Sequence, residues 1–231
     1  MPRRTRSERR TRSEKPLIIV FCEGQSERAY MEFLRKEFRD VACFNSFCAT
    51  EPFDYAESKF KKDAQLRSCI EVTDEVWFFF DVEQKDVASL GNRFEIIKRI
   101  RGLRKRPNIR VRLLMTTGCV EYWLLLHYEM CKPSIQTSAE KDGVETRLRA
   151  KMPSYKKGSA EATAKIAKDY PKAVNNARVT ISDLQPEGLP SLVDSDERNR
   201  WLCRSGFTFS TVYEAIDFLT GLKNARPNGL K

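Results

Sequence analysis

Two apolar segments of the chain end in carboxylates. Residues 17 to 22, LIIVFC, run directly into Glu23, and residues 75 to 81, EVWFFFD, end at Asp81 and are followed two residues later by Glu83. Continuous apolar runs of this length are typical of central strands in a parallel sheet. Because ligands bind outside the carboxyl ends of parallel strands, we expect Glu23, Asp81 and Glu83 to meet at one edge of the sheet.

Three carboxylates at close range repel one another and raise each other's pKa. A divalent cation removes that repulsion, and oxygen ligands of this kind suit Mg²⁺ or Mn²⁺. Such an ion polarises a phosphoryl oxygen and stabilises the attacking and leaving oxygens. Gly24 allows a sharp turn and a close approach of the backbone to a ligand, although a plain turn glycine fits the sequence equally well. Strand ends are also acidic simply because they meet solvent, so the residues alone leave both interpretations open.

Strand and helix patterns alternate through the first half of the chain, which favours an α/β fold with a mainly parallel sheet flanked by helices. The predicted strands are residues 17 to 22, 42 to 49, 75 to 81 and 109 to 117. The predicted helices are Ser26 to about Phe38, with Ser26 as N-cap, and residues 55 to 72, 88 to 104 and 119 to 130.

The second half is mostly helical and richer in Pro and Gly. The predicted helices are residues 140 to 150, residues 160 to 182 with a break near Pro171, and residues 210 to 222. No helix is predicted over residues 183 to 209. We therefore divide the chain into a basic disordered tail (1–15), an α/β core (16–130) and a mostly helical C-terminal region packed on the core (131–231).

Composition limits the class of protein. With 231 residues, 41% of them hydrophobic, the chain can bury one sizeable core. Its apolar stretches are shorter than the roughly 18 residues that a membrane span needs, and no apolar segment of a signal peptide follows the N-terminal arginines. The seven cysteines are scattered without a C-x-x-C, and His127 is the single histidine, which disfavours structural zinc. We expect a cytoplasmic protein with reduced thiols and no membrane partner.

The formal net charge is +10, and two segments are strongly basic. The first 15 residues contain seven basic and two acidic side chains, and residues 98 to 112 read KRIRGLRKRPNIRVR. Basic segments bind the phosphates of nucleic acid. The alternatives are a solvated tail and the exposed face of a helix followed by a turn, and neither segment identifies a ligand by itself.

The motifs together resemble a known family. Glu-Gly after one strand and Asp-x-Asp after a later one is the signature of Toprim domains, which occur in topoisomerases, primases and OLD-type nucleases. The longer pattern is similar to the RloB-like family, Toprim-related proteins associated with bacterial phage defence, over residues 17 to 219. The matching segments are IIVFCEGQSERAYMEFL, VWFFFDVEQKD, CVEYWLLLHYE, YKKGSAEATAKI and FTFSTVYEAIDFL.

The resemblance implies a Toprim-like core and roles for several acidic residues. Glu23 matches the Toprim glutamate, a metal ligand or general acid/base, and Asp81 matches the first aspartate of Asp-x-Asp. Glu83 stands in place of the second aspartate, a departure that shifts metal binding without excluding it. Glu27 falls where the family favours an acidic residue that supports the ligands.

Three further residues are candidates for the site. Glu121 follows the strand that ends near residue 117 and is expected to begin a helix beside the site as a catalytic residue. His127 lies six residues further along, about 120° out of alignment on a regular helix, so the two cannot share one pocket. His127 is therefore expected to pack in the core, the alternative being a general acid/base or phosphate contact. Tyr155, Lys156 and Lys157 lie in a loop before a helix, where the lysines, Lys156 in particular, are either phosphate contacts or part of an exposed basic loop.

The expected function is a Mg²⁺- or Mn²⁺-dependent nuclease that cleaves DNA or RNA in phage defence. The alternative is a catalytically degenerate Toprim module that binds nucleic acid or a partner ATPase encoded nearby. A homo-oligomer is compatible with either function. Neither G-x-x-x-x-G-K-[ST] nor G-x-G-x-x-G occurs, so nothing supports ATP hydrolysis by the chain itself.

Overall fold

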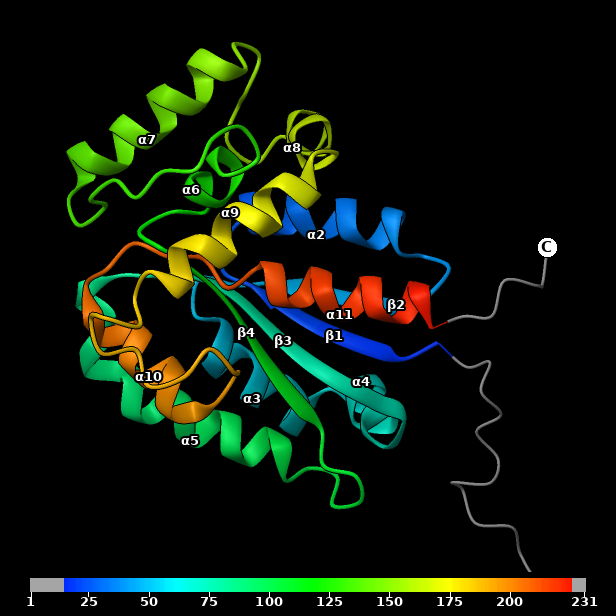
Figure 1. Ribbon diagram of the computed structural model, residues 1–231. Helices are drawn as coiled ribbons and strands as arrows, with labels where there is room; N and C mark the ends of the chain where they lie inside the picture. Colours follow the sequence, from blue (N-terminus) through cyan, green and yellow to red (C-terminus); the bar gives the residue numbers. More distant parts are fainter. Residues whose placement is uncertain (1–14, 226–231) are drawn as a thin grey trace, which may run out of the picture.

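The computed structural model describes residues 15 to 225 and has the predicted α/β architecture (Figure 1). A four-stranded sheet has the order β2-β1-β3-β4, and every neighbouring pair is parallel. The strands are β1 (Leu17–Cys22), β2 (Cys43–Cys48), β3 (Thr73–Val82) and β4 (Arg110–Thr117). The predicted basic tail lies outside the described residues except for its last residue, Lys15.

The two most apolar strands are the two central ones. Ile18 to Cys22 of β1 and Val76 to Phe80 of β3 are almost completely buried. A strand covered on both faces reads as a continuous apolar run, which explains why these two segments gave the clearest signal. Cys22 pairs with Phe79 and Asp81 pairs with Thr116, so the carboxyl ends of β1, β3 and β4 meet at one edge of the sheet.

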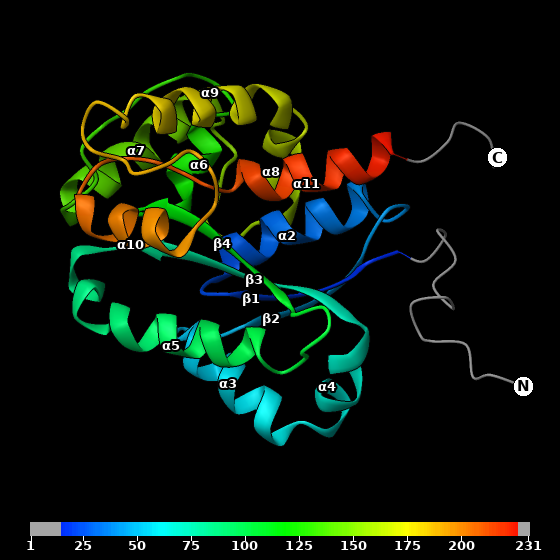
Figure 2. The same ribbon diagram turned by 60° about the horizontal axis from the view of Figure 1, so that its bottom comes forward.

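Helices cover both faces of the sheet (Figure 2). On one face lie α2 (Gln25–Glu37) and most helices of the C-terminal half. On the other face lie α3 (Pro52–Lys62), α4 (Ala64–Cys69) and α5 (Leu90–Arg101), the last preceded by the short 3₁₀ helix η2 (Gln84–Ser89). Helix α10 (Asp196–Ser205) of the C-terminal half packs against η2 and α5. Helix α6 (Val120–Leu125) leaves the carboxyl end of β4 and is buried along its whole length.

The C-terminal part is helical, as predicted, but contains one helix more than the sequence indicated. Its helices are α7 (Ser138–Lys151), α8 (Ala160–Ala167), α9 (Tyr170–Ser182), α10 (Asp196–Ser205) and α11 (Tyr213–Asn224). The break near Pro171 is confirmed, because this proline stands in the first turn of α9, where its missing N–H costs no hydrogen bond.

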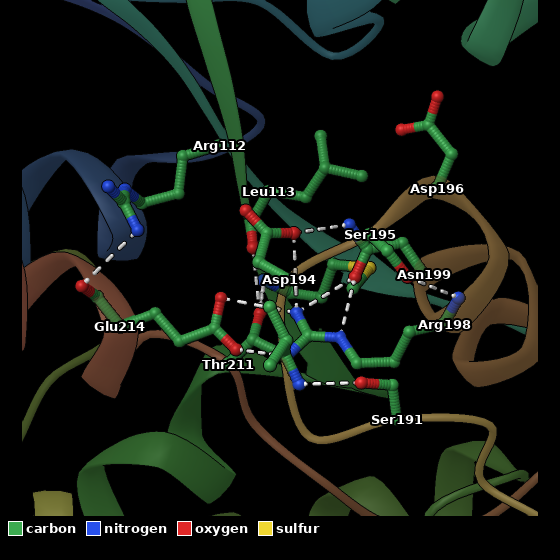
Figure 3. A network of polar contacts seen from close by, with 12 residues as sticks. Arg112, Leu113, Ser191, Asp194, Ser195, Asp196, Arg198, Asn199, Thr211 and Glu214 are labelled. Atoms are coloured by element: carbon green, nitrogen blue, oxygen red, sulfur yellow. Dashed lines mark hydrogen bonds and ion pairs between the residues drawn. The ribbon is translucent and has the colours of Figure 1, made fainter.

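Helix α10 lies within the segment for which no helix was predicted. The Ser195 side chain caps its N-terminus by accepting from the Arg198 N–H, and the helix ends at Gly206 with a φ of 70°. A buried network holds it in place (Figure 3). The fully buried Arg198 guanidinium donates to Glu214 Oε1 at 2.6 Å and to Asn199 Oδ1 at 2.9 Å. The local pattern of the sequence does not reveal the partner on another helix, Glu214.

The predicted N-cap of α2 was wrong by two residues. The helix begins at Gln25, Gly24 occupies the N-cap position, and no side chain caps it. The Ser26 hydroxyl instead points away from the helix end and takes part in the site described below.

All seven cysteines fall within the described part of the chain, and none forms a disulfide. Across residues 15 to 225, no helix combines the length and the apolar character that crossing a membrane requires.

Candidate functional site: a carboxylate pocket at the sheet edge

A pocket of about 300 Å³ opens at the carboxyl ends of β1 and β3. Its lining comes from the end of β1, the start of α2, the end of β3, the start of α6 and the loop before α8. The lining residues are Glu23, Gly24, Gln25, Ser26, Glu27, Asp81, Val120, Glu121, Lys157 and Gly158. Four carboxylates from four separate elements therefore converge on one cavity.

Glu23 and Asp81 are positioned by the sheet itself. The Glu23 N–H donates to the Phe79 carbonyl at 2.9 Å, which continues the pairing of β1 with β3. The Asp81 N–H donates to Glu23 Oε2 at 3.0 Å. Asp81 Oδ1 is buried and has no hydrogen-bond partner among the described residues. A buried, unpartnered carboxylate oxygen is costly, so a ligand that contacts it gains binding energy there.

Glu27 depends on the glycine before it. It lies in the first turn of α2 and is 4% exposed. A Cβ atom added to Gly24 would lie 2.8 Å from Glu27 Oε2, closer than real contacts allow. Gly24 therefore leaves room for this carboxylate, in addition to turning the chain into the helix. Burial, and then the charges of Glu23 and Glu121, raise the pKa of Glu27 to about 7.

Glu121 is held from three directions. Tyr155 donates its hydroxyl hydrogen to Glu121 Oε1 at 2.9 Å, and the Ser26 hydroxyl donates to the same oxygen at 3.5 Å. Lys157 Nζ lies 3.5 Å from Glu121 Oε2. The Gly158 N–H donates to Ser26 Oγ at 3.0 Å and fastens the loop to α2. This loop thus closes one side of the pocket and orients Glu121.

The electrostatics of the pocket favour a cation. Burial, followed by the charges of Glu27, Glu23 and Glu121, raises the pKa of Asp81 well above its usual value. Burial also raises the pKa of Glu23. Carboxylate oxygens are the ligands that Mg²⁺ and Mn²⁺ prefer, and the unpartnered Asp81 oxygen faces this cluster. Within residues 15 to 225, however, no group of three or more acidic, His or Cys side chains is already arranged to hold a metal. Binding therefore requires side-chain movement.

Glu83 lies apart from the pocket lining. Its carboxylate forms ion pairs with Lys85 and with Lys141 of α7. Partial burial alone would raise its pKa, but the hydrogen bonds from the two lysines outweigh burial and hold the pKa below its usual value. The structure thus brings Glu23 and Asp81 together. It places Glu83, the third predicted metal ligand, beside the ammonium groups of Lys85 and Lys141.

The two remaining candidates also lie outside the pocket lining. His127 is buried against Tyr30 and Trp123, with Nδ1 3.0 Å from the Trp123 carbonyl and Nε2 3.2 Å from the Tyr30 hydroxyl. Burial lowers its pKa to about 4. Lys156 is exposed, and its neighbour Lys157 reaches the pocket instead. The motif YKKGSAEATAKI located this loop, but only the fold decides which lysine faces the carboxylates.

The sequence placed Tyr155, Lys156 and Lys157 in one loop, but it did not indicate that Tyr155 and Ser26 hydrogen-bond to Glu121. It also left open the position of the basic run at residues 98 to 112. This run covers the end of α5, a turn and the start of β4, so it lies at the amino edge of the sheet, opposite the pocket (Figure 1). Most of its basic side chains are exposed, as in the predicted alternative of a solvated helix face and turn, but Arg104 and Arg112 are buried. Arg104 donates to backbone carbonyls, and Arg112 pairs with Glu75.

The fold and the pocket define an α/β protein with an acidic site at the carboxyl edge of a parallel sheet. The model of the RloB-like protein family matches residues 18 to 216, and the chain belongs to this family. The matched region contains every residue of the pocket lining. A search of curated proteins found no matching sequence.

Proposed function

We propose that this protein is a divalent-metal-dependent, Toprim-type nuclease that cleaves phosphodiester bonds of DNA or RNA in bacterial antiviral defence. The observation that carries the proposal is the pocket of Glu23, Glu27, Asp81 and Glu121 with its unpartnered Asp81 oxygen. The family resemblance supplies the defence role. The net charge of +10 fits a polyanionic substrate.

In this proposal Glu23, Glu27 and Asp81 hold the metal ion. A divalent cation bound there supplies Lewis-acid polarisation of a phosphoryl oxygen. Lys157, whose side chain is 62% exposed at the pocket, contacts a phosphate oxygen of the substrate. Glu121, oriented by Tyr155, accepts the proton of the attacking water.

The test is a cleavage assay with single-stranded DNA, duplex DNA, tRNA and other RNA in Mg²⁺ or Mn²⁺. Glu23→Ala and Asp81→Ala are expected to abolish cleavage. Glu95→Ala, which removes an exposed carboxylate on α5, is the control and is expected to retain activity. Cleavage that survives both pocket substitutions contradicts the proposal.

A second function is favoured by the surroundings of Glu83. Lys85 and Lys141 form ion pairs with the Glu83 carboxylate. The described residues also contain no group of side chains already arranged to bind a metal. The second candidate is therefore a catalytically degenerate module that binds nucleic acid or a partner ATPase. Calorimetric titration with Mn²⁺ separates the two functions, because absence of binding at millimolar Mn²⁺ favours the degenerate module.

A further inference from the structure

An exposed aromatic pair lies at the end of α10. The rings of Trp201 and Phe207 stack with centroids 5.9 Å apart and an interplanar angle of 19°. Phe207 is 36% exposed, whereas Trp201 packs partly against the core. Among the described residues, the Trp201 indole is the only ring in contact with Phe207. Phe207 is thus a partly exposed ring that is backed by a second, partly buried ring.

This pair lies at the same edge of the sheet as the carboxylate pocket. The Thr117 hydroxyl donates to the Phe207 carbonyl at 2.9 Å. Thr117 is the last residue of β4 and pairs with Val82, the neighbour of Asp81. Adjacent strands lie about 4.8 Å apart. Successive nucleotides of one strand are separated by roughly 3.4 Å along a duplex. The one strand spacing between Asp81 and the strand that contacts Phe207 therefore corresponds to a few nucleotides.

Helix α10 packs on the segment that follows Asp81. It contacts the 3₁₀ helix η2, which begins two residues after the end of β3, and it also contacts α5. In this segment Arg93 Nη2 of α5 lies 2.9 Å from Asp86 Oδ1 of η2. The element that carries Trp201 is therefore packed beside the end of β3, where Asp81 lies.

Positive charge accompanies the aromatic rings. Arg200 and Arg204 stand one helical turn apart on α10, on either side of Trp201 in the sequence. Arg200 is half-buried and its guanidinium lies 3.9 Å from the centroid of the Phe94 ring of α5. Arg204 is exposed and forms no ion pair with a described residue, although Glu197 is exposed two turns earlier. Exposed arginine beside an accessible aromatic face is the combination that binds a phosphate and stacks on a base.

The surrounding structure holds this platform in place. The buried Arg198 network fixes α10 to α11, as Figure 3 shows for Arg198 and Glu214. Beyond the helix, Gln136 Nε2 donates to the Gly206 carbonyl at 2.7 Å, directly before Phe207. A preorganised ring loses little conformational entropy when a ligand stacks on it.

We propose that Trp201 and Phe207 form a stacking platform for a base of single-stranded nucleic acid, with Arg204 contacting a neighbouring phosphate. The identity of the ligand rests on the proposed nuclease function, since the platform would receive a base a few nucleotides from the phosphate in the pocket. Platforms of this kind tolerate many sequences, because every base has a π-face.

Intrinsic fluorescence tests the platform directly. Of the three tryptophans, Trp77 and Trp123 are completely buried, so a change on ligand binding reports Trp201. The full chain is titrated in EDTA with a single-stranded oligonucleotide and with an abasic strand of the same length. We expect quenching and tighter binding with the base-containing strand. Equal affinity for the two strands overturns the proposal.

Substitutions at Phe207 separate base stacking from general apolar contact. Phe207→Ala and Phe207→Leu are expected to weaken oligonucleotide binding roughly 5- to 100-fold, and Phe207→Tyr to preserve it. Leu103→Ala, which shortens a comparably exposed apolar side chain at the amino edge, is the control and is expected to bind normally. If Phe207→Leu binds as well as the unaltered protein, the surface suits a protein partner and base stacking is overturned.

Failure of this proposal is distinguishable from failure of the proposed function. Binding is measured without metal and without cleavage, so a catalytically inactive protein still gives a clear result. Arg204→Ala adds a second readout, because loss of one phosphate contact is expected to lower the slope of log affinity against log salt by about one. An unchanged slope contradicts the assigned role of Arg204.

Discussion

The backbone N–H of Asp81 donates to Oε2 of Glu23 at 3.0 Å, so the carboxylate at the end of one central strand is held by the backbone of the other. The Asp81 side chain is half-buried, and its Oδ1 atom is buried without a hydrogen-bond partner among the described residues, in a pocket lined by three further carboxylates. The sheet pairing therefore determines the distance between the two acidic residues that the sequence singled out.

The first prediction concerns the hydrogen bond from Tyr155 to Glu121. Tyr155→Phe removes the donor and leaves the buried Glu121 carboxylate with a weaker set of partners, so the free energy of unfolding is expected to fall by about 1–3 kcal/mol. Urea denaturation measures the change. Tyr128→Phe is the control, because the Tyr128 hydroxyl donates no hydrogen bond to a described residue. Equal stability of the two variants would contradict the role given to Tyr155.

The second prediction concerns pH and Glu27. Its pKa is raised to about 7 in the folded protein, from an ordinary value of 4.5 that applies to the unfolded chain. Between these values the folded state binds more protons, so stability falls as pH rises from about 4.5 to 7. Glu27→Gln is expected to flatten the dependence of unfolding free energy on pH in this window and to stabilise the protein at pH 8. Denaturation curves at several pH values check this, with Glu95→Gln as control. If unfolding free energy depends on pH in the same way in Glu27→Gln as in the unaltered protein, Glu27 is not the titrating group.

The third prediction compares two glycines. Gly118 follows β4 with a φ of 73°, and an added Cβ would lie 2.4 Å from Ile135 Cγ2. Gly118→Ala is therefore expected to destabilise the protein by roughly 2–4 kcal/mol through backbone strain and overpacking. Gly143 lies inside α7, and a Cβ added there would have no atom within 4 Å other than those of its chain neighbours and of the helix backbone. Gly143→Ala is therefore expected to raise the free energy of unfolding by about 1 kcal/mol. Thermal unfolding measures both. A reversed order of the two variants would contradict the backbone geometry described for the end of β4.

The fourth prediction concerns the buried Arg198. Arg198→Leu leaves the Glu214 carboxylate buried without its partner and is expected to cost about 3–5 kcal/mol. Arg204→Leu on the exposed face of the same helix is the control and is expected to change stability by less than about 0.5 kcal/mol. Chemical denaturation of both proteins provides the measurement. A small effect of Arg198→Leu would mean that the network does not anchor α10.

The fold was predictable where local pattern and tertiary structure agree. The apolar runs of β1 and β3 and the helical periodicity between them indicated a parallel sheet, and the carboxylates at their ends indicated the edge at which the pocket lies. The helix α10 was not predictable, because the Arg198–Glu214 contact that stabilises it joins residues of two different helices.

The details of the site depended on contacts between distant segments. Ser26 has the pattern of an N-cap, yet its hydroxyl contacts Glu121 and Gly158, far away in the sequence. Lys156 and Lys157 are equivalent in the sequence, and only the path of the loop brings the second one to the pocket. Glu83 follows Asp81 closely, but its two lysine partners include one on α7 that the strand pattern cannot reveal.

The central claim is that the carboxylate pocket binds a divalent cation, and a crystal soaked with Mn²⁺ tests it most directly. We expect an anomalous difference peak beside Asp81 Oδ1, with Glu23 or Glu27 as a second protein ligand, and no peak in Asp81→Ala crystals treated in the same way. A Mn²⁺ soak that leaves the pocket without anomalous density, or a peak that persists beside Glu23 in Asp81→Ala, would contradict it.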